Sequence, residues 1–78
     1  MRCSHPERMD VRKRLGLRLQ RLRQERGLSQ EELADRSGLH RTYVSGVERG
    51  VRNPTISVLD KLAKGLAVTL QDLVTLDD

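Results

Sequence analysis

The chain has 78 residues, a mass of 8.9 kDa and a formal net charge of +4. A chain of this length holds one compact domain, which excludes large enzymes, transporters and multidomain receptors. Hydrophobic residues make up 36% and charged residues 33% of the chain, a balance typical of a globular domain. Tyr43 is the only aromatic residue, so we expect a core of Leu, Val, Ile and Ala. A small binding module is the class that remains.

The positive charge is concentrated at the N-terminal end. Residues 1–27 hold nine Lys or Arg against three Asp or Glu, residues 28–54 hold four of each, and residues 55–78 hold two against four. One basic end favours an oriented approach to a polyanion. Arginines also occur on solvated helix faces, so charge alone does not decide whether the chain binds nucleic acid.

The N-terminal residues indicate the cellular compartment of the protein and whether it binds a metal. Cys3 is the only cysteine, which excludes an internal disulfide and favours a reducing compartment. Cys3 and His5 are too few ligands for a zinc site, so we expect no metal, and no cofactor motif is present. No apolar run is long enough for a signal peptide or a membrane span, which predicts a cytoplasmic protein without a membrane partner. We expect residues 1–9 to be a flexible N-terminal segment and residues 10–78 to be the single domain.

The apolar periodicity predicts an all-α fold of five helices. The first covers about residues 10–26, with an inward stripe formed by Val11, Leu15, Leu19 and Leu22. Gly27 supplies the left-handed residue that ends many helices. Ser29 and Glu32 form a Ser-x-x-Glu capping box, which predicts the start of a short second helix that ends near Gly38.

Three further helices follow. The third is predicted over about residues 40–49, and a loop comes next because Pro54 biases the residue before it away from helix. The fourth covers about residues 55–66, and its inward face is expected to hold Ile56, Leu59, Leu62, Ala63 and Leu66. Thr69 and Asp72 form a weaker capping box for a short final helix. No segment alternates with period two for long enough to predict a strand.

The second and third helices have the pattern of a helix-turn-helix. Counted from Gln30 as position one, the pattern asks for apolar, small or glycine residues at positions that are occupied here by Leu33, Ala34, Gly38, Leu39, Val44 and Val47. Ala34 is small where the two helices cross, and Gly38 allows a backbone angle that is costly for other residues. Ser37 is the one departure, because an apolar residue is usual at its position.

Residues 15–73 resemble the Cro/lambda-repressor type of helix-turn-helix domain. The resemblance is carried by the stretches LSQEELA (28–34) and GLHRTYVSGVERG (38–50). The second stretch, followed by Arg52, Asn53 and Pro54, is similar to the controller proteins of restriction–modification systems. The resemblance implies a five-helix domain that binds DNA as a dimer. It also implies that Arg52 and Asn53 lie at the DNA, and that Arg23 and Glu48 form a structural ion pair that braces the first helix against the third.

The third helix has two distinct sides. At 100° per residue, its buried side is set by Val44 and Val47, and the opposite side is expected to hold Thr42, Gly46 and Arg49. Arg41 and Ser45 are expected on one flank of that side, and Tyr43 on the other. A mid-helix glycine costs about 1 kcal/mol relative to alanine. An outward-facing Gly46 therefore favours close approach of this helix to a groove floor, the alternative being a tolerated defect.

The predicted DNA-binding residues are Gln30, Arg41, Thr42, Tyr43, Ser45, Gly46, Arg49, Arg52 and Asn53. Arg41 is expected to donate to guanine O6 and N7, the alternative being a phosphate contact. Thr42 is expected at a thymine methyl or base edge, and Gln30 at a phosphate near a helix N-terminus. The hydroxyls of Tyr43 and Ser45 are within reach of phosphate or base, although Tyr43 alternatively covers the edge of the core.

Surplus apolar residues near the C-terminus predict a dimer. A small aliphatic core makes a marginal monomer, and the predicted interface residues are Val58, Val68, Leu70, Leu73 and Val74. A two-fold axis there places the third helices of the two copies, the recognition helices, about 34 Å apart. The DNA site is therefore expected to be an inverted repeat with half-sites about ten base pairs apart. The alternative is that Leu73 and Val74 cap the core of the monomer.

These features together predict a function. The chain holds no phosphate loop, no zinc spacing and no nucleophile–base pair, so it is not expected to be an enzyme. We expect a homodimeric, sequence-specific transcriptional regulator that binds a double-stranded DNA operator, and specifically a restriction–modification controller that acts on its own gene and the endonuclease gene. RNA polymerase is a candidate further partner. A phage-type repressor, the antitoxin of a toxin–antitoxin pair and a protein-interaction module that binds no DNA are the alternatives.

Overall fold

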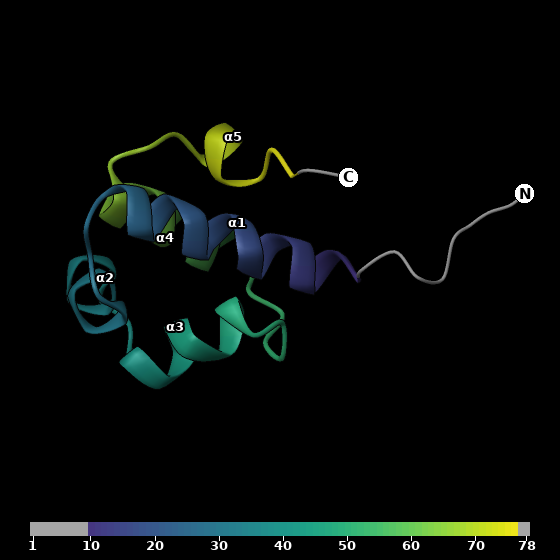
Figure 1. Ribbon diagram of the computed structural model, residues 1–78, viewed down its shortest axis with the longest axis horizontal. Coiled ribbons are helices and arrows are strands. Elements are labelled where there is room, and N and C mark those ends of the chain that lie inside the picture. The colour runs from purple at the N-terminus through teal and green to yellow at the C-terminus, as the bar shows by residue number, and fades with distance from the viewer. Residues whose placement is uncertain (1–9, 77–78) are drawn as a thin grey trace, which may run out of the picture.

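The structure, a computed structural model, describes residues 10–76 (Figure 1). It contains α1 (Val11–Glu25), α2 (Gln30–Ser37), α3 (Arg41–Glu48), α4 (Ile56–Leu66) and α5 (Leu70–Leu73), and no strand within the described range. The predicted all-α fold with five helices is confirmed. The expectations about residues 1–9, Cys3 and His5 included, lie outside the described residues. No helix within residues 10–76 is long and apolar enough to cross a bilayer.

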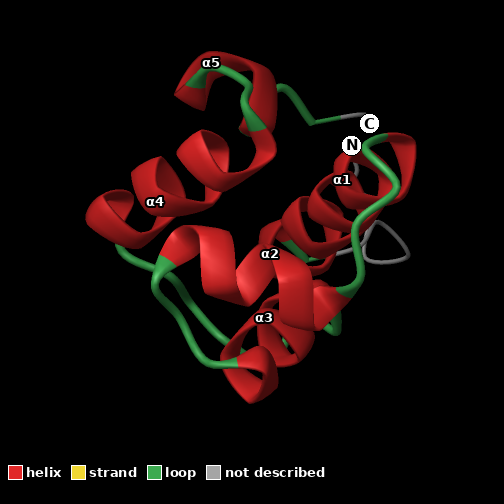
Figure 2. Cartoon of the chain, turned by 90° about the vertical axis from the view of Figure 1, so that its left-hand side faces the viewer, coloured by secondary structure: helices red, strands yellow, loops and turns green. Residues whose placement is uncertain are grey.

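The five helices α1 to α5 pack around one hydrophobic core. α1 runs through the middle of the molecule and packs on α3 and α5, while α2 packs on α3 and α4 (Figures 1 and 2). α3 lies on the opposite side of α1 from α5 (Figure 1). The buried hydrophobic side chains are aliphatic, as predicted: Leu15, Leu19, Leu22, Leu28, Leu33, Ala34, Val44, Val47, Leu62, Ala63, Leu66 and Leu73.

Local hydrogen bonds define the helix starts. The predicted capping box of α2 is present: Ser29 Oγ accepts from Glu32 N at 3.0 Å and Glu32 Oε1 accepts from Ser29 N at 2.8 Å. The bond from the Ser29 N–H holds the pKa of Glu32 below its usual value, because it favours the charged carboxylate. Asp10 caps α1 and accepts from the side chain and backbone of Arg12, which lowers the pKa of Asp10 to about 2. α2 ends at Gly38, whose φ of 69° is left-handed, as the motif requires.

Two predicted core residues are in fact exposed. Val11 is 58% exposed and Ile56 is 65% exposed. Each is the first residue of its helix, where the apolar stripe extends past the edge of the core. The periodicity was therefore correct for the direction of the stripe and wrong for its length.

Candidate nucleic-acid interface

The outward side of α3 is polar and basic. Arg41, Thr42 and Arg49 are exposed, and Ser45 is half-buried. On the other side, Val44 and Val47 are completely buried against α1 and α2. The predicted division of this helix into a buried and an outward side is confirmed for these residues.

Gly46 does not face open solvent, which corrects the expectation from periodicity. It is buried, and a Cβ at this position would lie 2.6 Å from Cγ and 3.2 Å from Nε of Arg52. The chain reverses after α3 because Gly50 adopts a φ of 79°, and Val51 N then donates to the Gly46 carbonyl oxygen at 3.0 Å. This reversal brings the stem of Arg52 back across the helix. A period of 100° per residue describes the helix alone and contains no information about the segment that follows.

Arg52 also contacts Tyr43. The guanidinium carbon of Arg52 lies 5.6 Å from the centre of the Tyr43 ring, within the range of a cation–π interaction. The ring of Tyr43 is half-buried and packs against the core, so it is fixed on one side and contacts Arg52 on the other. The structure thus brings three of the predicted site residues into one cluster, Tyr43, Gly46 and Arg52.

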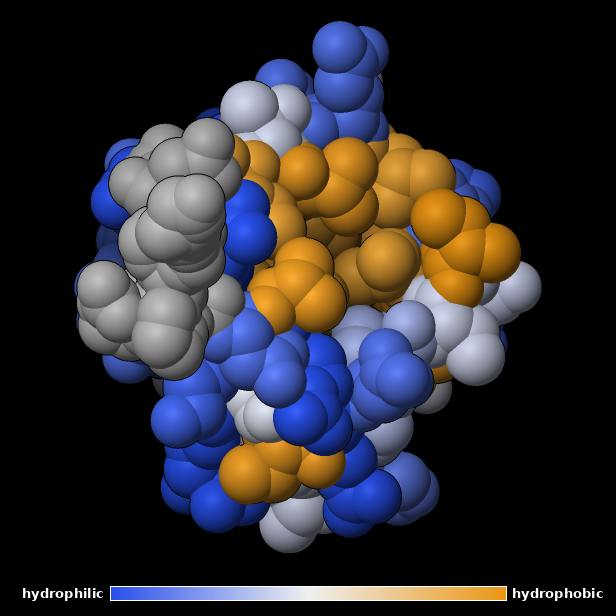
Figure 3. Space-filling model, turned by 90° about the vertical axis from the view of Figure 1, so that its right-hand side faces the viewer, coloured by the Kyte–Doolittle hydropathy of each residue, from blue (hydrophilic) through white to orange (hydrophobic). Residues whose placement is uncertain are grey.

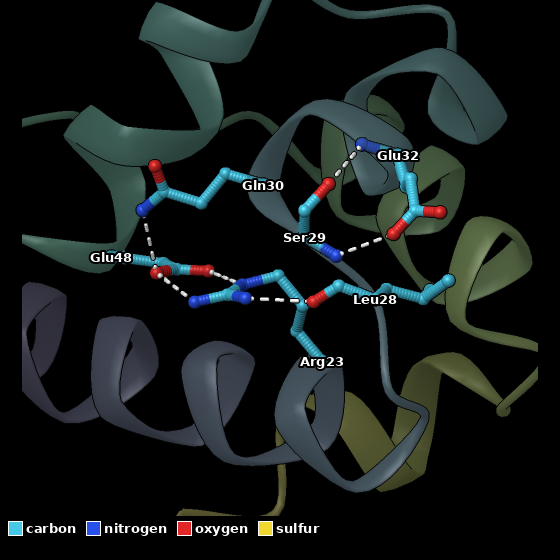
Figure 4. Close-up of polar contacts among 6 residues, drawn as sticks. All are labelled: Arg23, Leu28, Ser29, Gln30, Glu32 and Glu48. Carbon is cyan, nitrogen blue, oxygen red and sulfur yellow. Dashed lines mark hydrogen bonds and ion pairs between the residues drawn. The ribbon is translucent and has the colours of Figure 1, made fainter.

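The predicted ion pair between Arg23 and Glu48 is present and nearly buried (Figure 4). Arg23 Nε donates to Glu48 Oε2 at 2.6 Å and Nη2 donates to Oε1 at 3.2 Å, while Nη1 donates to the Leu28 carbonyl oxygen at 2.8 Å. The side chains are 11% and 3% exposed. Removing one partner of such a pair costs about 3–5 kcal/mol because the other charge is left buried.

Gln30 belongs to this network, which the sequence did not indicate. Its Nε2 donates to Glu48 Oε1 at 2.9 Å (Figure 4), so the amide is turned toward Glu48 and one of its donors is not available to a phosphate. The sequence placed Gln30 correctly in the first turn of α2 but carried no signal that α3 ends beside it. The network joins α1, α2 and the last residue of α3, and so fixes the orientation of α3 relative to the domain.

A second feature is an apolar hollow at the side of the molecule (Figure 3). This open pocket of about 340 Å³ is lined by Val11, Arg12, Leu15, Asn53, Pro54, Leu59, Val74 and Leu76. We call its apolar lining residues, Val11, Leu15, Pro54, Leu59, Val74 and Leu76, the apolar face. Asn53 is exposed and lies at this pocket, on the loop between α3 and α4.

The predicted dimer residues divide between the surface and the core. Val74 is 41% exposed and lies on the apolar face, and Val58, Val68 and Leu70 are half-buried. Leu73 is completely buried within the chain, so its place in a dimer interface is a wrong prediction. The short α5 packs on both α1 and α4, and this packing encloses Leu73 in the monomer core.

The site offers hydrogen-bond donors. Within residues 10–76, no three His, Cys, Asp or Glu side chains lie close enough to hold a metal ion. The exposed donors at the recognition helix come mainly from Arg41, Arg49 and Arg52, whose guanidinium groups suit phosphates and the guanine edge.

Comparisons with known proteins agree with this geometry. A helix-turn-helix family model matches residues 19–73. The uncharacterized HTH-type transcriptional regulator y4dJ of Sinorhizobium fredii is 50% identical over 70 residues, which cover 90% of this chain and 91% of that protein. Control protein C.SmaI of Serratia marcescens is 46% identical over 86% of this chain and 80% of its own length. The crystal structure of the restriction-modification controller protein C.AhdI from Aeromonas hydrophila matches with a TM-score of 0.78 and 48% identity, over 80% of this chain and 94% of that one. The chain therefore belongs to the helix-turn-helix family of DNA-binding transcriptional regulators and is not an enzyme.

Proposed function

We propose that this protein is a sequence-specific, homodimeric transcriptional regulator of the restriction–modification controller type. It acts in the cytoplasm on a double-stranded operator in the promoter of its own gene and in that of the endonuclease gene. The observation that carries the proposal is the combination of a basic, polar outward side on α3 with a buried network that fixes this helix. Its similarity to C.SmaI and C.AhdI supports the controller assignment.

The proposed contacts follow from exposure and reach. Arg41, in the first turn of α3, reads a guanine through O6 and N7, and Thr42 contacts the neighbouring base edge. Arg49 and Ser45 contact the DNA backbone or a base edge. Gln30 contributes its backbone N–H at the start of α2, because its side chain is partly engaged by Glu48.

Two copies would associate through the apolar face. Val74, Leu59 and Leu76 offer apolar surface that a monomer leaves in contact with water, and Asn53 lies at the same pocket. Val58, Val68 and Leu70 are the predicted neighbours of this contact. Association there favours an inverted-repeat site with half-sites about ten base pairs apart. RNA polymerase is a proposed further partner, because a regulator bound at a promoter lies beside the polymerase.

Selection from a random pool of DNA duplexes tests the proposal. The purified protein should enrich an inverted repeat, and Arg41→Ala should abolish the enrichment of one guanine in each half-site. Arg26→Ala is the matched control, since Arg26 lies at the end of α1 and donates to the Ala67 carbonyl oxygen on the side of α4. Failure to enrich any sequence would contradict the proposal and favour a protein-interaction module.

Sedimentation equilibrium tests the dimer. Wild type should be a dimer at tens of micromolar, and Val74→Glu should be a monomer because a carboxylate would be buried in the apolar face. Leu17→Glu is the control: Leu17 is 48% exposed on α1 and does not line the pocket, so this variant should stay dimeric. A monomeric wild type, or a Val74→Glu variant that still dimerises, would contradict the interface.

The identity of the neighbouring genes distinguishes a restriction–modification controller from a phage-type repressor or an antitoxin.

A further inference from the structure

The contact between Arg52 and Gly46 is unusual because a loop side chain occupies the place of a side chain of the recognition helix. Gly46 has no Cβ, and the Cγ, Nε and Cδ atoms of Arg52 lie where a Cβ would meet them, at 2.6, 3.2 and 3.5 Å. The guanidinium then extends over the ring of Tyr43, one turn earlier on α3. A glycine inside a helix lowers the stability of that helix. Here the absence of a Cβ lets one specific neighbour, the stem of Arg52, approach the helix backbone.

We propose that Gly46 and Tyr43 are positioning residues for Arg52. The bare backbone at Gly46 lets the Arg52 stem lie across α3, and the Tyr43 ring holds the guanidinium. Arg52 is thereby presented as an additional contact on the DNA-facing side of α3, although it belongs to the following loop. This inference rests on the proposed DNA-binding function and assigns the partner of Arg52 as a phosphate or a guanine edge.

This arrangement should raise the affinity for DNA because it holds the Arg52 side chain in place before DNA binds. A free arginine side chain loses rotamer freedom when it binds, whereas one already held on two sides loses less. Arg52 remains exposed while it is held, so its donors stay available to a ligand. The arrangement differs from simple groove clearance, in which Gly46 matters because DNA itself comes close to it.

NMR on the DNA-free protein tests the arrangement itself. The Arg52 side-chain protons should show an upfield ring-current shift in wild type and in Tyr43→Phe, and should lose it in Tyr43→Leu. Gly46→Ala should also remove the shift, because its Cβ displaces the Arg52 stem. Absence of the shift in wild type would overturn the inference. These spectra need no DNA, so they read the arrangement even if the proposed function fails.

A double-mutant cycle tests the consequence for binding, with the duplex that wild type enriches from the random pool as the probe. Gly46→Ala and Tyr43→Leu should each weaken binding by about threefold to tenfold, in line with a cation–π contact and lost preorganisation. In an Arg52→Ala background, both substitutions should have little further effect. Tyr43→Phe removes the hydroxyl but keeps the ring, so whatever effect it has on binding should be the same with and without the Arg52 side chain.

The alternatives give different results. Groove clearance predicts that Gly46→Ala weakens binding equally with and without Arg52, and equal losses would overturn the inference while the proposed function stands.

Thermal unfolding of each variant separates folding from binding, and Gly46→Ala should be at least as stable as wild type because alanine favours helix. If Gly46→Ala fails to fold, the Tyr43→Leu and Arg52→Ala pair alone decides, and additive losses in that pair would overturn the inference. A wild type that enriches no duplex would instead defeat the proposed function.

Discussion

Gly16 of α1 lies directly against the backbone of α3 at Glu48. A Cβ at Gly16 would overlap the Glu48 carbonyl oxygen and lie 2.5 Å from the carbonyl oxygen of Val47. Backbone atoms cannot move aside as a flexible side chain can. This contact sets the distance between α1 and the recognition helix, and the ion pair of Arg23 with Glu48 adds to it.

Gly16→Ala should therefore lower the free energy of unfolding by about 1–3 kcal/mol, the usual cost of overpacking. Helix propensity acts in the opposite direction by about 1 kcal/mol, so a net loss identifies the clash. Urea unfolding followed by circular dichroism measures the free energy of unfolding of Gly16→Ala and of its control. Gly46→Ala is the matched control, since its Cβ meets only the Arg52 side chain. Equal stability of the two variants would contradict the close contact.

Ser37→Ala should raise the free energy of unfolding by about 1 kcal/mol. The Ser37 hydroxyl is buried, faces Gly65 of α4 and has no hydrogen-bond partner among residues 10–76. An unsatisfied buried polar group costs about 1–3 kcal/mol. The midpoint of urea unfolding measures the gain. Ser29→Ala is the control of opposite sign, because it removes the α2 cap and should lose about 1 kcal/mol. A loss of stability in Ser37→Ala would show that the hydroxyl is satisfied.

Ala67→Gly should also stabilise the protein. Ala67 ends α4 with a φ of 60°, in the left-handed region that costs an L residue about 1–2 kcal/mol and costs glycine little. We expect a gain of about 1 kcal/mol, measured as a higher melting temperature. Ala63→Gly, inside the same helix, should lower the melting temperature. A destabilised Ala67→Gly would mean that residue 67 is not left-handed in solution.

Local patterns predicted much of the fold and less of the site. The cap at Ser29 and the turn at Gly38 involve residues a few positions apart, so their chemistry is visible in the sequence. The direction of Val44 and Val47 into the core follows from helix period alone. Two expectations failed where a distant segment decides the environment: Arg52 covers Gly46, and α1 and α4 enclose Leu73. Glu48 also engages the Gln30 side chain, a contact that the sequence did not indicate. Periodicity gives the direction of a side chain on its own helix and does not say what will lie against it.

Arg41→Ala should remove the base preference at one position of each half-site, at a cost of about 1–3 kcal/mol against the preferred base. Arg41 is exposed in the first turn of α3, where a recognition helix contacts base edges. Fluorescence anisotropy on single-base variants of the selected duplex measures the effect. Equal losses on every variant would assign Arg41 to a phosphate and leave another residue to read the base.

Methylation interference tests the central claim most directly, because dimethyl sulfate marks N7 of guanine in the major groove, where α3 is proposed to lie. The selected duplex is methylated sparsely, bound by the wild-type protein and separated from the unbound fraction. We predict two clusters of interfering guanines related by two-fold symmetry, with centres about ten base pairs apart. Interference at a single cluster would contradict the dimer, and binding that is insensitive to guanine N7 would contradict the placement of α3 in the major groove.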